Sequence, residues 1–197
     1  MRSVVIIGKG NSVKRSTAGY IDSFSEVAIC NRPIFKGYEH FLSDHADISF
    51  ETSPRSLEPN TEYHRKLGIK KIFPTGGTSE LRRAFRFKNL DPSTGTLALS
   101  HYLSKPQYTK ICLVGFDLFQ VGSRMYYFSN EELDEGQRYL TENGTYSYDL
   151  TINIESGHNI QLTADFITMS FKRFPDIAFE IISDFPFNYV GKNCKFL

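Results

Sequence analysis

The feature that most constrains the fold is a set of short apolar runs, rich in Val and Ile, with helical segments between them. The runs predict buried β-strands at residues 4–7, 26–30, 110–114 and 178–182, and weaker strands at 47–50 and 70–73. The intervening segments predict helices at residues 16–24, 79–87, 96–104, 131–140 and 161–174. Strands that alternate with helices are typical of parallel sheets, because each parallel connection must cross back over the sheet. We therefore expect an α/β fold, a mostly parallel sheet with helices on both faces.

Length and charge narrow the class of protein further. The 197 residues, 40% of them hydrophobic, suit a single Rossmann-like domain spanning residues 1–197, and no linker or repeat divides them. A formal net charge of +1 gives no basis for nucleic-acid binding, so we expect small-molecule partners. Residues 143–159 are polar and contain glycine, which predicts a long loop of the kind that lines a site. Residues 186–197 show no clear element.

The cysteines indicate a reduced environment. Cys30, Cys112 and Cys194 are odd in number, widely separated and outside any zinc-binding spacing, so neither a disulfide framework nor a metal site is expected. The apolar run at 4–7 is too short for a signal peptide or a membrane span. We therefore expect a cytoplasmic protein. Two lysines in the tail GKNCKFL leave open a peripheral contact with an anionic inner-membrane surface, and the oligomeric state, including a homo-oligomer, stays open.

The first predicted strand ends in a glycine-bearing turn, Gly8-Lys9-Gly10-Asn11-Ser12. In doubly wound sheets this turn binds a nucleotide phosphate or sugar, because glycines let the backbone approach the ligand. Ser12 is expected to cap the following helix. The dinucleotide fingerprint is not matched, since Val13 replaces its third glycine and the second strand ends in the neutral Asn31, which suits a base or sugar hydroxyl. A tight turn without a ligand and an NAD- or SAM-dependent enzyme are the alternatives.

A second polar turn, Asp91-Pro92-Ser93-Thr94-Gly95, precedes the helix predicted at 96–104. Ser93 or Thr94 is expected to cap this helix. The free amides and the positive end of the helix dipole would then form a site for a carboxylate or a phosphate. A cap without any ligand is the alternative interpretation.

Together the two turns carry a family resemblance. Residues 8–39, GKGNSVKRSTAGYIDSFSEVAICNRPIFKGYE, resemble the large sialyl motif of eukaryotic sialyltransferases, and residues 92–117, PSTGTLALSHYLSKPQYTKICLVGFD, resemble their small sialyl motif. The same segments are similar to the Campylobacter-type bacterial sialyltransferases. The resemblance implies a variant of the GT-A fold and an inverting, metal-independent glycosyltransferase without a cofactor. Such an enzyme moves sialic acid, or a related acidic sugar, from its CMP conjugate to a hydroxyl of a glycan acceptor.

The resemblance also implies a donor site. The residues that would line the CMP moiety are Gly8, Lys9, Gly10, Ser12 and Asn31. Those that would hold the carboxylate and phosphate of the donor are Ser93, Thr94 and Gly95. Arg32 is a candidate contact for the acceptor or the donor carboxylate. Lys9 stands where both families have asparagine, so its charge either alters the donor contact or helps to hold the phosphate.

The resemblance to sialyltransferases also implies catalytic roles for a histidine and two tyrosines. His158, in ESGHNIQLTADF, matches the catalytic histidine of both families, and its ordinary pKa suits a general base. Tyr126 and Tyr127, in GSRMYYF, are candidate donors to the departing phosphate. His40, His45 and His64 are expected at the surface, and His101, within a predicted helix, is expected either to pack in the protein or to face solvent. Phe119 replaces a phosphate-binding tyrosine, and with Lys9 it favours the alternative of a non-catalytic nucleotide-binding protein on the same scaffold.

Overall fold

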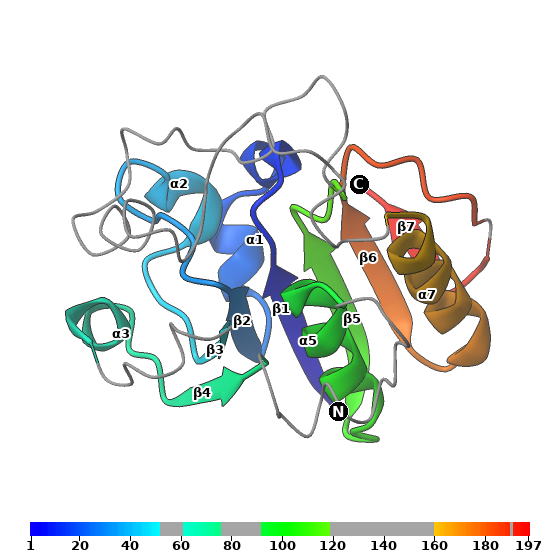
Figure 1. Cartoon of the computed structure of the whole chain (residues 1–197), viewed down its shortest axis with the longest axis horizontal. Helices are drawn as coiled ribbons and strands as arrows, with labels where there is room; N and C mark the ends of the chain where they lie inside the picture. The colour runs from blue at the N-terminus through cyan, green and yellow to red at the C-terminus, as the bar shows by residue number, and fades with distance from the viewer. Residues whose placement is uncertain (52–60, 76–91, 119–159, 190) are drawn as a thin grey trace.

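The computed structural model describes residues 1–51, 61–75, 92–118, 160–189 and 191–197. These residues form one seven-stranded sheet in the order β4-β3-β2-β1-β5-β6-β7, and every neighbouring pair is parallel (Figure 1). The strands are β1 (Arg2–Ile7), β2 (Glu26–Cys30), β3 (Ile48–Glu51), β4 (Lys71–Pro74), β5 (Tyr108–Val114), β6 (Ala178–Ile182) and β7 (Cys194–Phe196). The six strands predicted from the sequence are therefore all present, and the prediction of a parallel α/β fold is confirmed.

Helices cover both faces of this sheet. They are the 3₁₀-helix η1 (Asn11–Arg15) and the α-helices α1 (Ala18–Asp22), α2 (Glu39–Leu42), α3 (Glu62–Lys66), α5 (Thr94–Leu103) and α7 (Ile160–Arg173). Apolar residues of η1, α1 and α2 pack against one face of the sheet, and those of α5 and α7 pack against the other. The helices predicted at 79–87 and 131–140, and the loop predicted at 143–159, lie outside the described residues.

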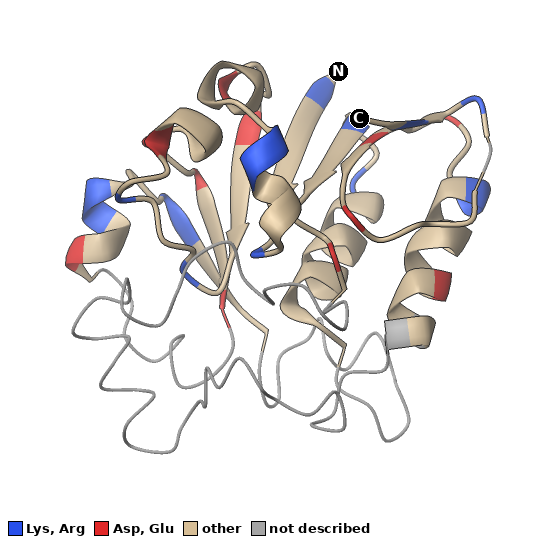
Figure 2. Ribbon diagram, turned by 90° about the horizontal axis from the view of Figure 1, so that it is seen from above, with Lys and Arg blue, Asp and Glu red and all other residues tan. Residues whose placement is uncertain are grey.

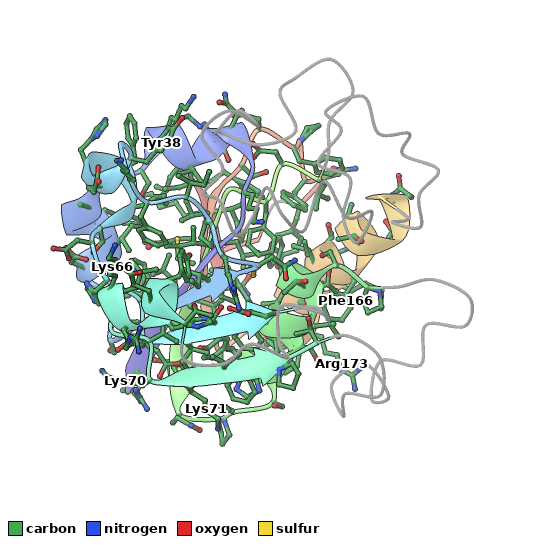
Figure 3. All side chains as sticks on the ribbon, turned by 60° about the vertical axis from the view of Figure 1, so that its left-hand side comes forward. Tyr38, Lys66, Lys70, Lys71, Phe166 and Arg173 are labelled. Carbon is green, nitrogen blue, oxygen red and sulfur yellow. The ribbon has the colours of Figure 1, made fainter. Side chains whose placement is uncertain are left out.

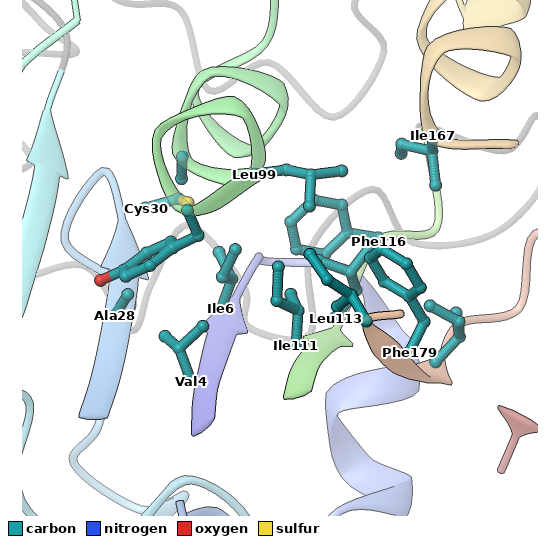
Figure 4. Packing of buried hydrophobic residues seen from close by; sticks show 14 of the residues in the cluster. Val4, Ile6, Ala28, Cys30, Leu99, Ile111, Leu113, Phe116, Ile167 and Phe179 are labelled. Atoms are coloured by element: carbon teal, nitrogen blue, oxygen red, sulfur yellow. The ribbon is translucent and has the colours of Figure 1, made fainter. Parts of the chain in front are cut away.

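The central strands are buried on both sides, which explains their continuous apolar sequences. The side chains of β1 alternate between the two cores, and all of Val4 to Ile7 are inaccessible to solvent. Figure 4 shows Leu99 of α5 and Ile167 of α7 lying over the face that carries Ile111 and Leu113. Burial of such side chains is the main favourable contribution to folding, about 1.5–3 kcal/mol for each large apolar residue.

The tail contains an element that the sequence did not reveal. Residues 191–197 include β7, which adds to the sheet beside β6, so the absence of a clear element there was a wrong expectation. The Asn193 carboxamide donates to the carbonyls of Phe171 (2.9 Å) and Phe174 (3.2 Å) at the end of α7. The bond to Phe171 satisfies one of the carbonyls that a helix end leaves without a partner, and together the two bonds fix the tail to the end of α7.

The two edge strands are short and carry lysine. Figure 3 shows Lys70 and Lys71 on the outer side of β4, where Lys71 begins the strand and Pro74 ends it. On the opposite edge β7 carries Lys195. Lysine and proline on an edge strand discourage pairing with another sheet.

The three cysteines, Cys30, Cys112 and Cys194, are free thiols. Burial raises the pKa of the first two to about 12 and that of Cys194 to about 11, so all three stay protonated at neutral pH. In the described ranges, no helix has the length and apolarity needed to cross a bilayer. Among the same residues there is no group of three or more His, Cys, Asp or Glu side chains that could hold a metal ion. Figure 2 shows acidic and basic residues interspersed over the described elements.

Candidate functional site

The order of the strands places a switch point between β1 and β5. From β1 the chain adds β2, β3 and β4 on one side, and it then returns to add β5, β6 and β7 on the other. In open α/β sheets, ligands bind outside the carboxyl ends of the strands at such a point. The residues that leave the carboxyl ends here are Gly8 after β1, Asn31 after β2 and Gly115 after β5.

The turns after β1 and β5 pack backbone against backbone. The Gly10 N–H donates to the Gly115 carbonyl at 2.9 Å. Gly115 has a left-handed φ of +73°, and a Cβ there would lie 2.6 Å from a methyl carbon of Val13. A Cβ on Gly8 would lie 2.5 Å from the Gly115 carbonyl oxygen. The glycines of the first turn are therefore required by this close approach of the two turns.

Asp117 joins the two turns, and sequence reasoning did not include it among the site residues. Its buried carboxylate accepts hydrogen bonds from the Ser12 N–H (2.8 Å), the Ser12 hydroxyl (2.5 Å) and the Asp184 N–H (2.9 Å). The expectation that Ser12 caps the next helix is wrong, because Thr17 caps α1 and the hydroxyl of Ser12 donates to Asp117. The signal that could have revealed Asp117 is its position in Gly-Phe-Asp, directly after a buried strand.

The second predicted turn begins α5, as expected. The Ser93 hydroxyl accepts a hydrogen bond from the Thr96 N–H at 3.2 Å, so Ser93 is the cap and the helix starts two residues earlier than predicted. Gly95 packs on the ring of Phe116, where a Cβ would lie 2.7 Å from the nearest ring carbon. No hydrogen bond joins the N–H groups of Thr94 or Gly95 to another part of the chain that the structure describes. These two amides lie at the positive end of the α5 dipole, a position that favours an anion.

A side-chain hydrogen bond brings the two predicted segments together. The Asn31 Nδ2 donates to the Thr94 hydroxyl at 2.9 Å, which connects the carboxyl end of β2 to the first residue of α5. Lys9 lies close enough for its charge to act on the Cys30 thiol at the end of β2. The first turn, Asn31 and the start of α5 therefore surround one region at the switch point.

Arg32 and His64 are both buried, and both contact the carboxylate of Glu51. Arg32 is buried, and its Nη2 lies 3.1 Å from Oε2 of Glu51, a residue that is fully buried at the end of β3. His64 was expected at the surface, and this is wrong: the residue is 1% exposed and its Nε2 lies 2.7 Å from Oε1 of Glu51. The residues of α3 around His64 are charged and mostly exposed, which is why the sequence suggested a surface position.

His101 packs inside the protein. It lies against Phe50 and Phe73, with ring centroids 5.4 and 4.4 Å away. Burial, together with the charges of Lys105 and Lys71, lowers its pKa to about 4, so the ring is neutral at pH 7. His158, Tyr126, Tyr127 and Phe119 lie outside the described residues, and their roles stay predictions.

Solved structures with this fold are known. No protein-family model and no curated protein matches the sequence. The sialyltransferase CstII from Campylobacter jejuni, solved in complex with cytidine-5'-monophosphate, superposes with a TM-score of 0.64 at 15% identity, covering 98% of this chain and 85% of that one. The fold is that of the sialyltransferases. The monofunctional alpha-2,3-sialyltransferase Cst-I from the same organism gives a TM-score of 0.59 at 13% identity, covering 96% of this chain and 81% of that one.

A mammalian sialyltransferase in complex with Gal-beta-1-3GalNAc-ortho-nitrophenol has the sialyltransferase fold as well. Its TM-score is 0.55 at 14% identity, over 90% of this chain and 68% of that one. Bacterial and mammalian sialyltransferases were the two groups that the motif segments resemble. The resemblance read from those segments is therefore confirmed at the level of the fold.

Proposed function

We propose that the protein is a glycosyltransferase that moves sialic acid, or a related acidic sugar, from its CMP conjugate to a hydroxyl of a glycan acceptor. The observation that carries this proposal is the hydrogen bond between Asn31 and Thr94 at the switch point of a sialyltransferase fold. CMP is bound in the CstII structure described above, and CstII has also been solved with CMP and a trisaccharide acceptor.

The donor would bind through backbone amides, the dipole of one helix, the Asn31 carboxamide and the charge of Lys9. The amides of Thr94 and Gly95 at the positive end of α5 suit its phosphate and carboxylate. Asn31 lies beside them and suits the base or ribose. Gly8 and Gly10 let the first turn approach the turn after β5 closely, and Lys9 of the first turn adds a positive charge. Ser12 contributes through Asp117, which keeps this turn against the turn after β5.

We propose that the reaction is inverting and needs no metal ion, as the resemblance to sialyltransferases implies. In this reaction His158 takes the proton from the acceptor hydroxyl, and the hydroxyl oxygen attacks the anomeric carbon of the donor sugar. The bond between that carbon and the phosphate oxygen breaks, and CMP departs with the electron pair. Tyr126 or Tyr127 donates a hydrogen bond to the departing phosphate, and the α5 amides stabilise its charge.

The test is to incubate the protein with CMP-sialic acid and a lactoside acceptor and to follow CMP release and transfer. His158→Ala is expected to lower turnover by about 100- to 10,000-fold, because it removes the base, and to leave the Kd for CMP within about twofold. His40→Ala, on the exposed first turn of α2, is the matched control with unchanged turnover.

Each alternative outcome has a clear meaning. An unchanged rate for His158→Ala removes that residue as the base. CMP binding by the parent protein without release of sugar from the conjugate supports a non-catalytic nucleotide-binding protein on the same scaffold, as the replacements at Lys9 and Phe119 favour. Binding of NAD or S-adenosylmethionine in place of CMP would contradict both interpretations.

A further inference from the structure

A buried cluster of ionisable side chains lies directly beside Asn31. Its centre is the carboxylate of Glu51, which is fully buried. Oε2 accepts hydrogen bonds from Arg32, whose Nε and Nη2 both lie 3.1 Å away. Oε1 accepts from the Ser49 hydroxyl and pairs with His64 Nε2, both at 2.7 Å. Each carboxylate oxygen is thus held by at least one donor, as a buried charge requires.

The hydrogen bonds of His64 fix its tautomer. The backbone N–H of Thr61 donates to Nδ1 at 3.2 Å, so Nδ1 is an acceptor and carries no proton. The proton therefore resides on Nε2, which donates to Glu51. Both ring nitrogens of His64 are thus held inside the cluster, so its contribution to the neighbouring donor site is one of position.

The backbone at the end of β2 needs such support. Asn31 and Arg32 have φ values of 56° and 51°, two successive left-handed residues without a glycine. This conformation costs free energy and persists only where the surrounding structure enforces it. Here the Asn31 N–H donates to the Phe50 carbonyl at 2.9 Å, and the Arg32 side chain binds the next residue, Glu51. The Glu51 carbonyl in turn accepts from the Thr75 N–H at 2.7 Å, which ties it to the end of β4.

We propose that Glu51 and His64 are positioning residues of the donor site. Glu51 holds Arg32 in the left-handed corner, His64 holds the carboxylate, and the corner directs the Asn31 carboxamide to Thr94. Among the described residues, the hydrogen bonds of Glu51 and His64 reach Arg32, Ser49 and Thr61, so the effect on Thr94 passes through Arg32 and Asn31. The proposal rests on the proposed function for the identity of the ligand, and on the geometry of the ligand-free protein for the positioning itself.

Two substitutions of His64 separate its two hydrogen bonds. In His64→Gln the amide nitrogen can reach the place of Nε2, so the hydrogen bond to Glu51 is kept and that from Thr61 is lost. In His64→Asn the amide oxygen can reach the place of Nδ1, so the bond from Thr61 is kept and that to Glu51 is lost. The two variants therefore make opposite predictions for the site.

The first measurement uses the ligand-free protein and the NMR signal of the Asn31 side-chain amide. Its hydrogens are expected to exchange with solvent faster in His64→Asn than in the parent protein, and at the parent rate in His64→Gln. The second measurement is the Kd for CMP, expected to rise about tenfold in His64→Asn and to stay within about twofold in His64→Gln. Glu51→Gln, which places an amide donor against Arg32, is expected to behave like His64→Asn.

Glu26 supplies the matched control. It lies at the other end of β2, is also buried, and also pairs with an arginine, Arg2 at 3.1 Å. Glu26→Gln is expected to lower stability without changing the Asn31 amide signal or the Kd for CMP.

The outcomes are distinguishable. Parent-like amide exchange and CMP affinity in both His64→Asn and Glu51→Gln would overturn the positioning role. A parent protein that does not bind CMP would contradict the proposed function instead, and the amide signal would then decide the positioning role by itself. If Glu26→Gln alters the Asn31 signal as much as Glu51→Gln does, the effect is one of general stability and the proposal is wrong.

Discussion

At each end of β2 a buried glutamate carboxylate is paired with an arginine, and the two pairs differ in their surroundings. At the amino end, buried Glu26 accepts hydrogen bonds from the hydroxyls of Tyr102 (2.5 Å) and Tyr108 (2.9 Å) and from Arg2 (3.1 Å). At the carboxyl end, buried Glu51 has the comparable set of partners described above, with Arg32 as its cation. Burial and the neighbouring Glu26 raise the pKa of Tyr108 to about 12, and they raise that of Tyr102 as well, so both remain donors.

The difference lies in what each carboxylate holds. Glu26 links residues of regular strands and of α5 to a half-exposed arginine. Glu51 holds a left-handed corner, and the residue next to its arginine reaches into the proposed site. Costly backbone conformations are retained mainly where binding or catalysis needs them. The comparison therefore supports the proposal of a donor site at the carboxyl edge of the sheet.

Removal of each arginine is the most severe test of this comparison. Arg32→Ala leaves the Glu51 carboxylate buried without its cation and is expected to lower the free energy of unfolding by about 3–5 kcal/mol. Arg2→Ala removes a cation whose side chain is 49% exposed, against 9% for Arg32, and is expected to cost less than about 1 kcal/mol. Urea unfolding followed by circular dichroism measures both values.

Equal losses for the two arginine variants would break the comparison, because they would mean that the different exposure of Arg2 and Arg32 does not distinguish the two ion pairs. A large loss for Arg32→Ala with unchanged CMP affinity in the folded protein would separate the stability of the corner from its role in binding. Only the combined loss of stability and affinity fits the account.

Buried His64 and half-buried His101 give a smaller, pH-dependent contrast. Both nitrogens of His64 have partners, whereas the buried Nε2 of His101 has none among the described residues. Because the pKa of His101 is about 4 in the folded protein and about 6.5 when unfolded, the unfolded chain binds the proton more tightly. The free energy of unfolding therefore carries no penalty from His101 above about pH 6.5, and it decreases as the pH falls from 6.5 towards 4.

Replacement of His101 by a residue that does not titrate sharpens this contrast. The urea midpoint of the parent protein is expected to fall between pH 7 and pH 5, and that of His101→Gln is expected to fall less over the same interval. An identical fall in both proteins would mean that carboxylates elsewhere, and not His101, account for the acid sensitivity.

Much of the sheet could be predicted because its strands are short runs of Val and Ile that no other buried element explains as well. The Ser93 cap was predictable for a similar reason, since a hydroxyl directly before an apolar helical stretch satisfies amides that the helix leaves free. β7 was not, because three residues including Lys195 and the half-buried Cys194 show no pattern, and the strand depends on Asn193 and β6.

The cluster around Glu51 was beyond local sequence reasoning. Arg32, Glu51 and His64 come from three segments, and they meet only because β3 lies beside β2 and α3 lies beside both strand ends. His64 sits in a short helix whose other residues are mostly exposed, so composition indicated a surface position. The convergence of Asn31 with Thr94, by contrast, was implied by the resemblance to sialyltransferases, because one ligand would have to contact both segments.

The central claim is that the start of α5 and the end of β2 form one anion-binding donor site. The most direct measurement is a titration of the ¹⁵N-labelled protein with CMP, followed through its amide resonances. The account predicts the largest shifts at the Thr94 and Gly95 amides and the Asn31 side chain, with Tyr102, near the far end of the same helix, little changed. Saturable CMP binding that leaves Thr94 and Gly95 unshifted would contradict it.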